Sequence, residues 1–248
     1  MAVLSPRDRR ALWVDVGRGI AIVAMVAYHF SFDLLYFGFV DWNVTSGTYW
    51  RAFAEAIASS FLFLVGVSLV YAHGTRVRWR PFLWRLLLVG GCAALVTIGT
   101  TFAMPAPIYF GILHAIFTFS VLALVFLRAP LPITLVVAAA VFAAPYIFTA
   151  PAYDTALLYP LGLGATKPFT FDYEPIFPWF SVTLLGVVAG RFIRRPEPGA
   201  SGYNMAGPFL RAVAAAGRNS LIIYIAHQPV LFALFMLAIA VLGQPAPA

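Results

Sequence analysis

The chain has 248 residues, of which 62% are hydrophobic and only 10% are charged. A soluble domain carries roughly 25% charged residues, so this composition excludes an ordinary water-soluble protein. The formal net charge of +7 comes almost entirely from arginines in short clusters between apolar runs, which is typical of loops beside membrane spans and not of a nucleic-acid-binding surface.

Apolar runs follow one another along the whole chain, and each approaches the length of about 20 residues that crosses a bilayer as a helix. A spanning segment must be helical, because lipid offers no hydrogen bonds to a bare backbone. We therefore expect an all-α fold, a polytopic transmembrane helix bundle of about seven spans, as a single integral membrane domain over residues 1–248. The expected spans are residues 12–37, 50–72, 82–103, 107–127, 131–149, 174–193 and 220–242.

Several features within and between these spans are predicted as well. The fourth span should open at Pro107, since proline suits a first helical turn. Residues 151–173 form the longest connection, and its glycines and prolines indicate irregular backbone. A second loop at 196–207 precedes a short interfacial helix at 208–216, also opened by a proline. Gly186 and Gly190, four residues apart in the sixth span, predict close helix packing.

The placement of Lys and Arg predicts the orientation in the membrane. One set of alternate connections holds Arg51 and Lys167 only. The rule that positive loops stay inside therefore puts the N-terminus in the cytoplasm and, with seven spans, the C-terminus outside. The other set of connections holds Arg7, Arg9, Arg10, Arg76, Arg78, Arg80, Arg85, Arg128, Arg191, Arg194, Arg195, Arg211 and Arg218.

The first span carries four ionisable residues, and each costs about 2.5–3.5 kcal/mol inside a membrane. Arg18 and His29 are eleven positions apart and fall within roughly 20° of each other on a helix. Asp33 lies one turn beyond His29 on the same stripe, and Asp15 is within reach of Arg18. The pattern indicates either a polar track through the membrane or an interfacial Asp15–Arg18 ion pair beside a packed core histidine.

Further polar residues occur in the later spans. His114 is in a helix that enters from the outside, and the rise per residue brings it to a depth similar to that of His29. We therefore predict that His29, Asp33 and His114 line one cavity in the outer half of the bilayer, although a lone intramembrane histidine is often structural. Candidate acceptor or cavity residues are Asp172, Trp179, His227 and Gln228.

Each of these later candidates also has a purely structural interpretation. Asp172 and Trp179 are typical of an aromatic interface belt with solvated acids. His227 and Gln228 are typical of polar residues that join neighbouring helices. Asn219 or Ser220 is expected to cap the start of the last span. The sequence contains no P-loop, Gly-x-Ser-x-Gly elbow or His-Glu-x-x-His pattern, and no metal site is predicted.

Several blocks in order along the chain resemble one family. The opening block is Asp15-Val16-Gly17-Arg18-Gly19-Ile20-Ala21, with Met25 and Tyr28-His29-Phe30. Later blocks are Phe110-Gly111-Ile112-Leu113-His114, Phe177-Pro178-Trp179-Phe180 and Gly217-Arg218-Asn219-Ser220-Leu221, followed by Tyr224 and His227-Gln228-Pro229. Together they resemble the bacterial transmembrane acyltransferases that are similar to the catalytic domain of heparan-alpha-glucosaminide N-acetyltransferase. The spacing of Arg18 and His29 is also that of the related acyltransferase-3 family.

The resemblance implies a reaction in which an acyl group, commonly acetyl, passes from acyl-CoA to a sugar hydroxyl or amine of the cell envelope. The implied partners are the lipid bilayer of a bacterial-type inner membrane, acyl-CoA and an envelope glycan or related acceptor, with a homo-oligomer as a further option and no nucleic acid. In this scheme Arg18, with Asp15, meets the anionic CoA, and His29 is the general base. Asp33 orients His29, and His114 positions substrate or stabilises the oxyanion, with the roles of the two histidines interchangeable.

The chain departs from the family pattern at one position. In lysosomal members the catalytic histidine stands three residues ahead of a Trp-Asn pair, whereas here Phe39 has that place before Trp42-Asn43. The role therefore falls to His29 or His114. The alternative function is a non-enzymatic membrane protein, a small transporter or an assembly subunit, that uses the Arg/His/Asp track for ions. A transporter usually shows a repeat or matched broken helices, and neither is evident here.

Overall fold

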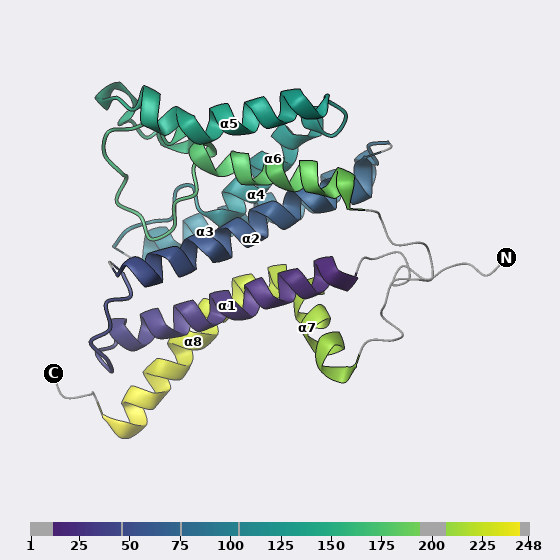
Figure 1. The fold of residues 1–248 in the computed structure, drawn as a ribbon. Coiled ribbons are helices and arrows are strands. Elements are labelled where there is room, and N and C mark those ends of the chain that lie inside the picture. Colours follow the sequence, from purple (N-terminus) through teal and green to yellow (C-terminus); the bar gives the residue numbers. More distant parts are fainter. Residues whose placement is uncertain (1–11, 46, 75, 104, 194–206, 244–248) are drawn as a thin grey trace. The chain divides into compact units, whose positions relative to one another are not determined.

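The computed structural model describes residues 12–45, 47–74, 76–103, 105–193 and 207–243 (Figure 1). This part of the chain is helical and without strands, which confirms the predicted all-α class. Most of the predicted loop at 196–207 lies outside the described residues. The α-helices are α1 (Leu12–Tyr36), α2 (Thr48–His73), α3 (Trp79–Ala103), α4 (Ile112–Phe126), α5 (Leu131–Phe148), α6 (Ile176–Phe192), α7 (Pro208–Arg218) and α8 (Ser220–Leu242).

The helices agree closely with the predicted spans. Among the described residues, α1, α2, α3, α5 and α8 are long and apolar enough to cross a membrane, and α4 and α6 are apolar but shorter. The chain is thus an integral membrane protein of the helical type. Helix α7 is the predicted short helix, with Pro208 in its first turn. The orientation, with a cytoplasmic N-terminus, stays a prediction.

Helix α4 begins at Ile112 and not at Pro107, because other partners hold the backbone of the preceding residues. The carbonyl of Ile108 accepts a hydrogen bond from Thr97 Oγ1 at 2.7 Å, and its amide donates to Thr100 Oγ1 at 3.0 Å. The carbonyl of Phe110 accepts the amide of Glu174 at 2.8 Å. These groups are therefore engaged in a loop structure that the proline signal at Pro107 does not reveal.

Packing divides the chain into two compact units, residues 1–60 with 196–248 and residues 61–195. In the first unit, α1 packs against α7 and α8. Glycines allow α1 and α7 to approach closely. A Cβ atom at Gly19 would meet the carbonyl oxygen of Val213, and one at Gly217 would meet that of Asp15. Larger residues at these two positions are excluded unless the helices separate.

In the second unit, α6 packs against α4, α5 and the second half of α2. A Cβ atom at Gly186 would meet the carbonyl oxygen of Phe63, and one at Gly190 would lie 3.1 Å from Cα of Val67. The predicted close packing at these two glycines is therefore confirmed. The hydroxyl of Thr183 also donates to the carbonyl of Leu62 at 3.2 Å, which ties the two helices together.

Candidate functional site

The predicted site residues of the first unit meet where α1 packs on α8. His29 and Asp33 come from α1, and His227 and Gln228 come from α8. The ring centroids of His29 and His227 are 4.8 Å apart, and Gln228 Nε2 donates to Asp33 Oδ1 at 2.8 Å. Asp33 is fully buried. We call these four residues the α1–α8 polar cluster.

Three buried atoms of this cluster have no hydrogen-bond partner among the described residues: Asp33 Oδ2, His227 Nε2 and Gln228 Oε1. A buried polar atom left unpaired costs about 1–3 kcal/mol, so native proteins keep few of them. An ionised carboxylate and an amide oxygen both accept hydrogen bonds. The cluster therefore has the chemistry of a binding site that takes hydrogen-bond donors from a ligand.

The predicted pairing of Asp33 with His29 is not formed in the described part of the chain. One carboxylate oxygen of Asp33 accepts the amide of Gln228, and the other has no partner. Helical spacing places His29 and Asp33 on one stripe of α1. The side-chain amide of Gln228 from α8, however, donates the hydrogen bond that offsets the cost of burying the carboxylate. The ring of His29 lies instead beside that of His227.

Aromatic side chains cover the α1–α8 contact beyond this cluster. Phe235 of α8 lies with its ring centroid 5.2 Å from that of Phe37 and 5.7 Å from that of Phe39. Phe39 thus has an apolar packing role at the position where lysosomal members of the resembled family carry their histidine. The assignment of the catalytic histidine to His29 or His114 stays a prediction.

His114 belongs to the second unit. Its Nε2 atom lies 3.1 Å from Oγ1 of Thr97 in α3, and its ring is beside that of Phe110, with centroids 5.9 Å apart. The side chain lines a groove of about 480 Å³ between α3 and α4, together with small and apolar residues that include Gly90 and Gly91. Because His29 belongs to the first unit and His114 to the second, the shared cavity stays a prediction. The contact with Thr97 was missed from the sequence, where a threonine in an apolar run carries no signal.

The family described as "Heparan-alpha-glucosaminide N-acetyltransferase, catalytic" matches residues 10–229, most of the chain and all of the α1–α8 polar cluster. The chain belongs to this family. Neither a curated protein nor a solved structure matched it. By this description the family is one of N-acetyltransferases.

Asp15 and Arg18, which are predicted to bind CoA, lie in the first two turns of α1. Asp15 is buried, and its carbonyl oxygen faces Gly217 of α7 at the close α1–α7 approach. Arg18 is half-buried. Along α1, Arg18 is about 16 Å from His29 by the helical rise. Binding of CoA by Arg18 stays a prediction.

Asp172 supports the start of α4. Its Oδ2 atom accepts the amide of Ile112 at 2.9 Å, so a carboxylate sixty positions along the chain caps the helix. Gly111 leaves the room for it, because a Cβ atom there would meet this carboxylate. Asp172 was predicted to be an acceptor or cavity residue. Its contact with α4 shows in addition that it caps this helix. Trp179 is half-buried in the first turn of α6.

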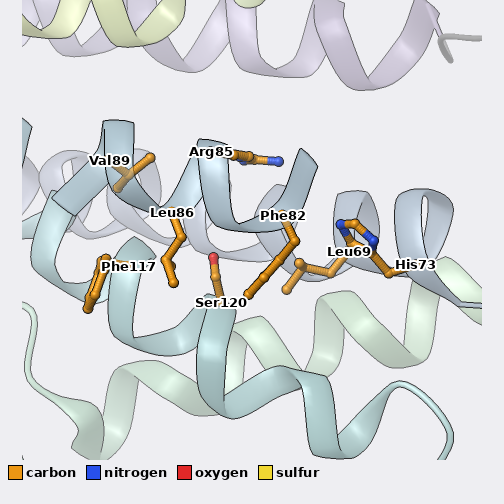
Figure 2. Close-up of a pocket in the computed structure, with 8 residues that line it drawn as sticks. All are labelled: Leu69, His73, Phe82, Arg85, Leu86, Val89, Phe117 and Ser120. Carbon is orange, nitrogen blue, oxygen red and sulfur yellow. The ribbon is translucent and has the colours of Figure 1, made fainter. Parts of the chain in front are cut away.

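A smaller cavity of about 20 Å³ lies between the end of α2, the first half of α3 and the middle of α4 (Figure 2). His73 and Arg85 are at its edge, and Nδ1 of His73 accepts the backbone N–H of Arg78 at 3.2 Å. The hydroxyl of Ser120 donates to the carbonyl of Ile116 at 2.6 Å. This volume holds about one water molecule, so the cavity is too small for an acyl group and a sugar.

Proposed function

We propose that this protein transfers an acetyl group from acetyl-CoA to an amine or hydroxyl of a cell-envelope sugar, within a bacterial-type inner membrane. The observation that carries the proposal is the α1–α8 polar cluster, whose unpartnered buried atoms lie inside the range matched by the acetyltransferase family. A merely structural cluster would be expected to satisfy its own hydrogen bonds.

The cluster has the groups that acyl transfer to a nucleophile requires. A histidine takes the proton from the acceptor N–H or O–H, and the acceptor atom attacks the thioester carbonyl carbon. The bond between this carbon and sulfur then breaks, and the protonated histidine returns its proton to the CoA thiolate. Since two imidazolium ions at 4.8 Å would repel each other, at most one ring of the His29–His227 pair is positively charged at a time. Burial of the cluster keeps water from the thioester.

The donor end of the reaction is assigned to Arg18. A guanidinium forms charge-assisted, bidentate hydrogen bonds with phosphate groups. The stretch of α1 from Arg18 to His29, about 16 Å long, then runs beside the arm that links the phosphates of CoA to its thioester. Asp15 lies one turn before Arg18 and is assigned to hold it in position.

The test uses purified protein in detergent with isotope-labelled acetyl-CoA and glucosamine, and product detection by mass spectrometry. Wild type should form N-acetylated product. His29→Ala and His227→Ala should each lower kcat, by about 10²-fold or more for the residue that transfers the proton. His73→Gln is the matched control, because His73 is a buried histidine of the second unit, and it should retain activity.

Absence of transfer to glucosamine and to sugar hydroxyls, with acetyl-CoA present, would contradict the proposal. Full activity of both cluster variants would contradict it as well. In either case the polar cluster would be better explained by the alternative, a transporter or assembly subunit that uses these residues for ions.

A further inference from the structure

We infer that Nε2 of His227 is the atom that accepts the proton from the acetyl acceptor, and that the carbonyl of Tyr224 fixes the tautomer that makes this possible. The inference rests on the proposed acetyl transfer and assigns the proton to one atom of the cluster. It places His29 in a positioning role beside the reacting ring.

The tautomer of His227 follows from a single contact. Its Nδ1 atom lies 2.6 Å from the backbone carbonyl oxygen of Tyr224. A carbonyl oxygen accepts hydrogen bonds and has no proton to give, so Nδ1 must be the donor. A neutral imidazole carries one N–H, which leaves Nε2 with the lone pair. Because Tyr224 and His227 are one turn apart on α8, this arrangement is set within one helix.

The lone pair on Nε2 is placed for a ligand and not for the protein. The atom is buried and has no partner among the described residues. Asp33 Oδ2 and Gln228 Oε1 are unpartnered in the same cluster, and both are acceptors when Asp33 is ionised. A bound group that brings several N–H or O–H protons would satisfy all three atoms, and one of these protons would lie on Nε2 of His227.

His29 has no comparable anchor. In the described part of the chain, no hydrogen bond fixes either of its ring nitrogens, and the carboxylate of Asp33 is engaged by Gln228. Its ring instead lies against His227, tilted by 58°, and against Tyr28, with centroids 5.7 Å apart. His29 therefore packs the cluster and holds His227 in place, while the backbone of α8 gives His227 the fixed tautomer that a general base requires.

The first test measures the tautomer without any reaction. Wild-type protein with ¹⁵N-labelled histidine is purified in detergent, and long-range ¹H–¹⁵N spectra are recorded without acetyl-CoA. The His227 signals are assigned by their loss in His227→Gln. We expect neutral His227 with the proton on Nδ1. A proton on Nε2, or an even mixture of tautomers, would overturn the inference even if acetyl transfer is confirmed.

The second test compares matched substitutions in single-turnover acetyl transfer to glucosamine. His227→Gln should lower the rate by about 10²-fold or more, with little change in the KM for acetyl-CoA. His29→Gln should lower it several-fold less, and His73→Gln should leave it unchanged. A loss in His29→Gln as large as that in His227→Gln would refute the assignment to His227. Failure of the wild type to transfer acetyl groups would instead contradict the proposed function, and the spectra would still decide the tautomer.

Discussion

The crossing of α2 and α6 allows a quantitative test of the packing in the second unit. A Cβ atom at Gly186 would meet the carbonyl oxygen of Phe63, and one at Gly66 would meet that of Thr183. Both contacts are with backbone atoms, which cannot rotate away as the end of a flexible side chain can. The substitution Gly186→Ala must therefore push the two helices apart.

The size of this effect is obtained by comparison with a glycine that has open space around it. Overpacking of a close contact costs about 1–3 kcal/mol, while alanine gains up to about 1 kcal/mol over glycine in a helix. Nothing lies within 4 Å of a Cβ atom at Gly99 of α3. Gly99→Ala therefore has the higher helix propensity of alanine without the cost of overpacking. The free energies of unfolding of the two variants should thus differ by about 1–3 kcal/mol.

Cys92 provides the measurement, because it is the single cysteine of the chain and is half-buried on α3 in the same unit. A dye that becomes fluorescent on reaction with a thiol reports its exposure while the protein is heated in detergent. We expect Gly186→Ala to unfold at a lower temperature than Gly99→Ala. Equal transition midpoints for the two variants would refute the close α2–α6 crossing.

Three further predictions concern charged and titratable groups. Arg18→Ala should weaken acetyl-CoA binding by about tenfold or more, since a hydrogen bond to a charged group is worth about 1.5–3 kcal/mol; unchanged affinity in calorimetry would remove Arg18 from the donor site. Asp172→Ala should lower the stability by about 1 kcal/mol through loss of the α4 cap, and a thermal midpoint equal to that of wild type would contradict this role. Burial, with Tyr159 and Asp154 nearby, raises the pKa of Tyr173 from 10.0 to about 12. The folded state favours the protonated phenol. Its contribution to the free energy of unfolding is therefore complete below pH 10 and is lost between pH 10 and about 12. Tyr173→Phe should flatten the stability profile in that interval, and an unaltered slope would argue against the buried phenol.

Local sequence patterns predicted the class of the fold and the positions of its helices. Hydrophobic run length is a local property, so the last span was predicted at the bounds that α8 has, Ser220–Leu242. Helical periodicity likewise placed His29 and Asp33 on one stripe of α1. Close packing at Gly186 and Gly190 was visible because small residues at this spacing have few other uses in a membrane helix. The blocks from Asp15 to Pro229 were sufficient to identify the family.

Which polar groups meet depends on how the helices pack against one another. Asp33 pairs with Gln228, far away in the chain, because the contact depends on which face of α8 packs against α1, and periodicity within one helix contains no information on its neighbour. Asp172 caps α4 for the same reason. The anchor of His227 is a backbone carbonyl, a group that every residue has, so no pattern of side chains could indicate it. The proposed role of Nε2 of His227 rests on its burial without a partner among the described residues, which is a property of the packed molecule alone.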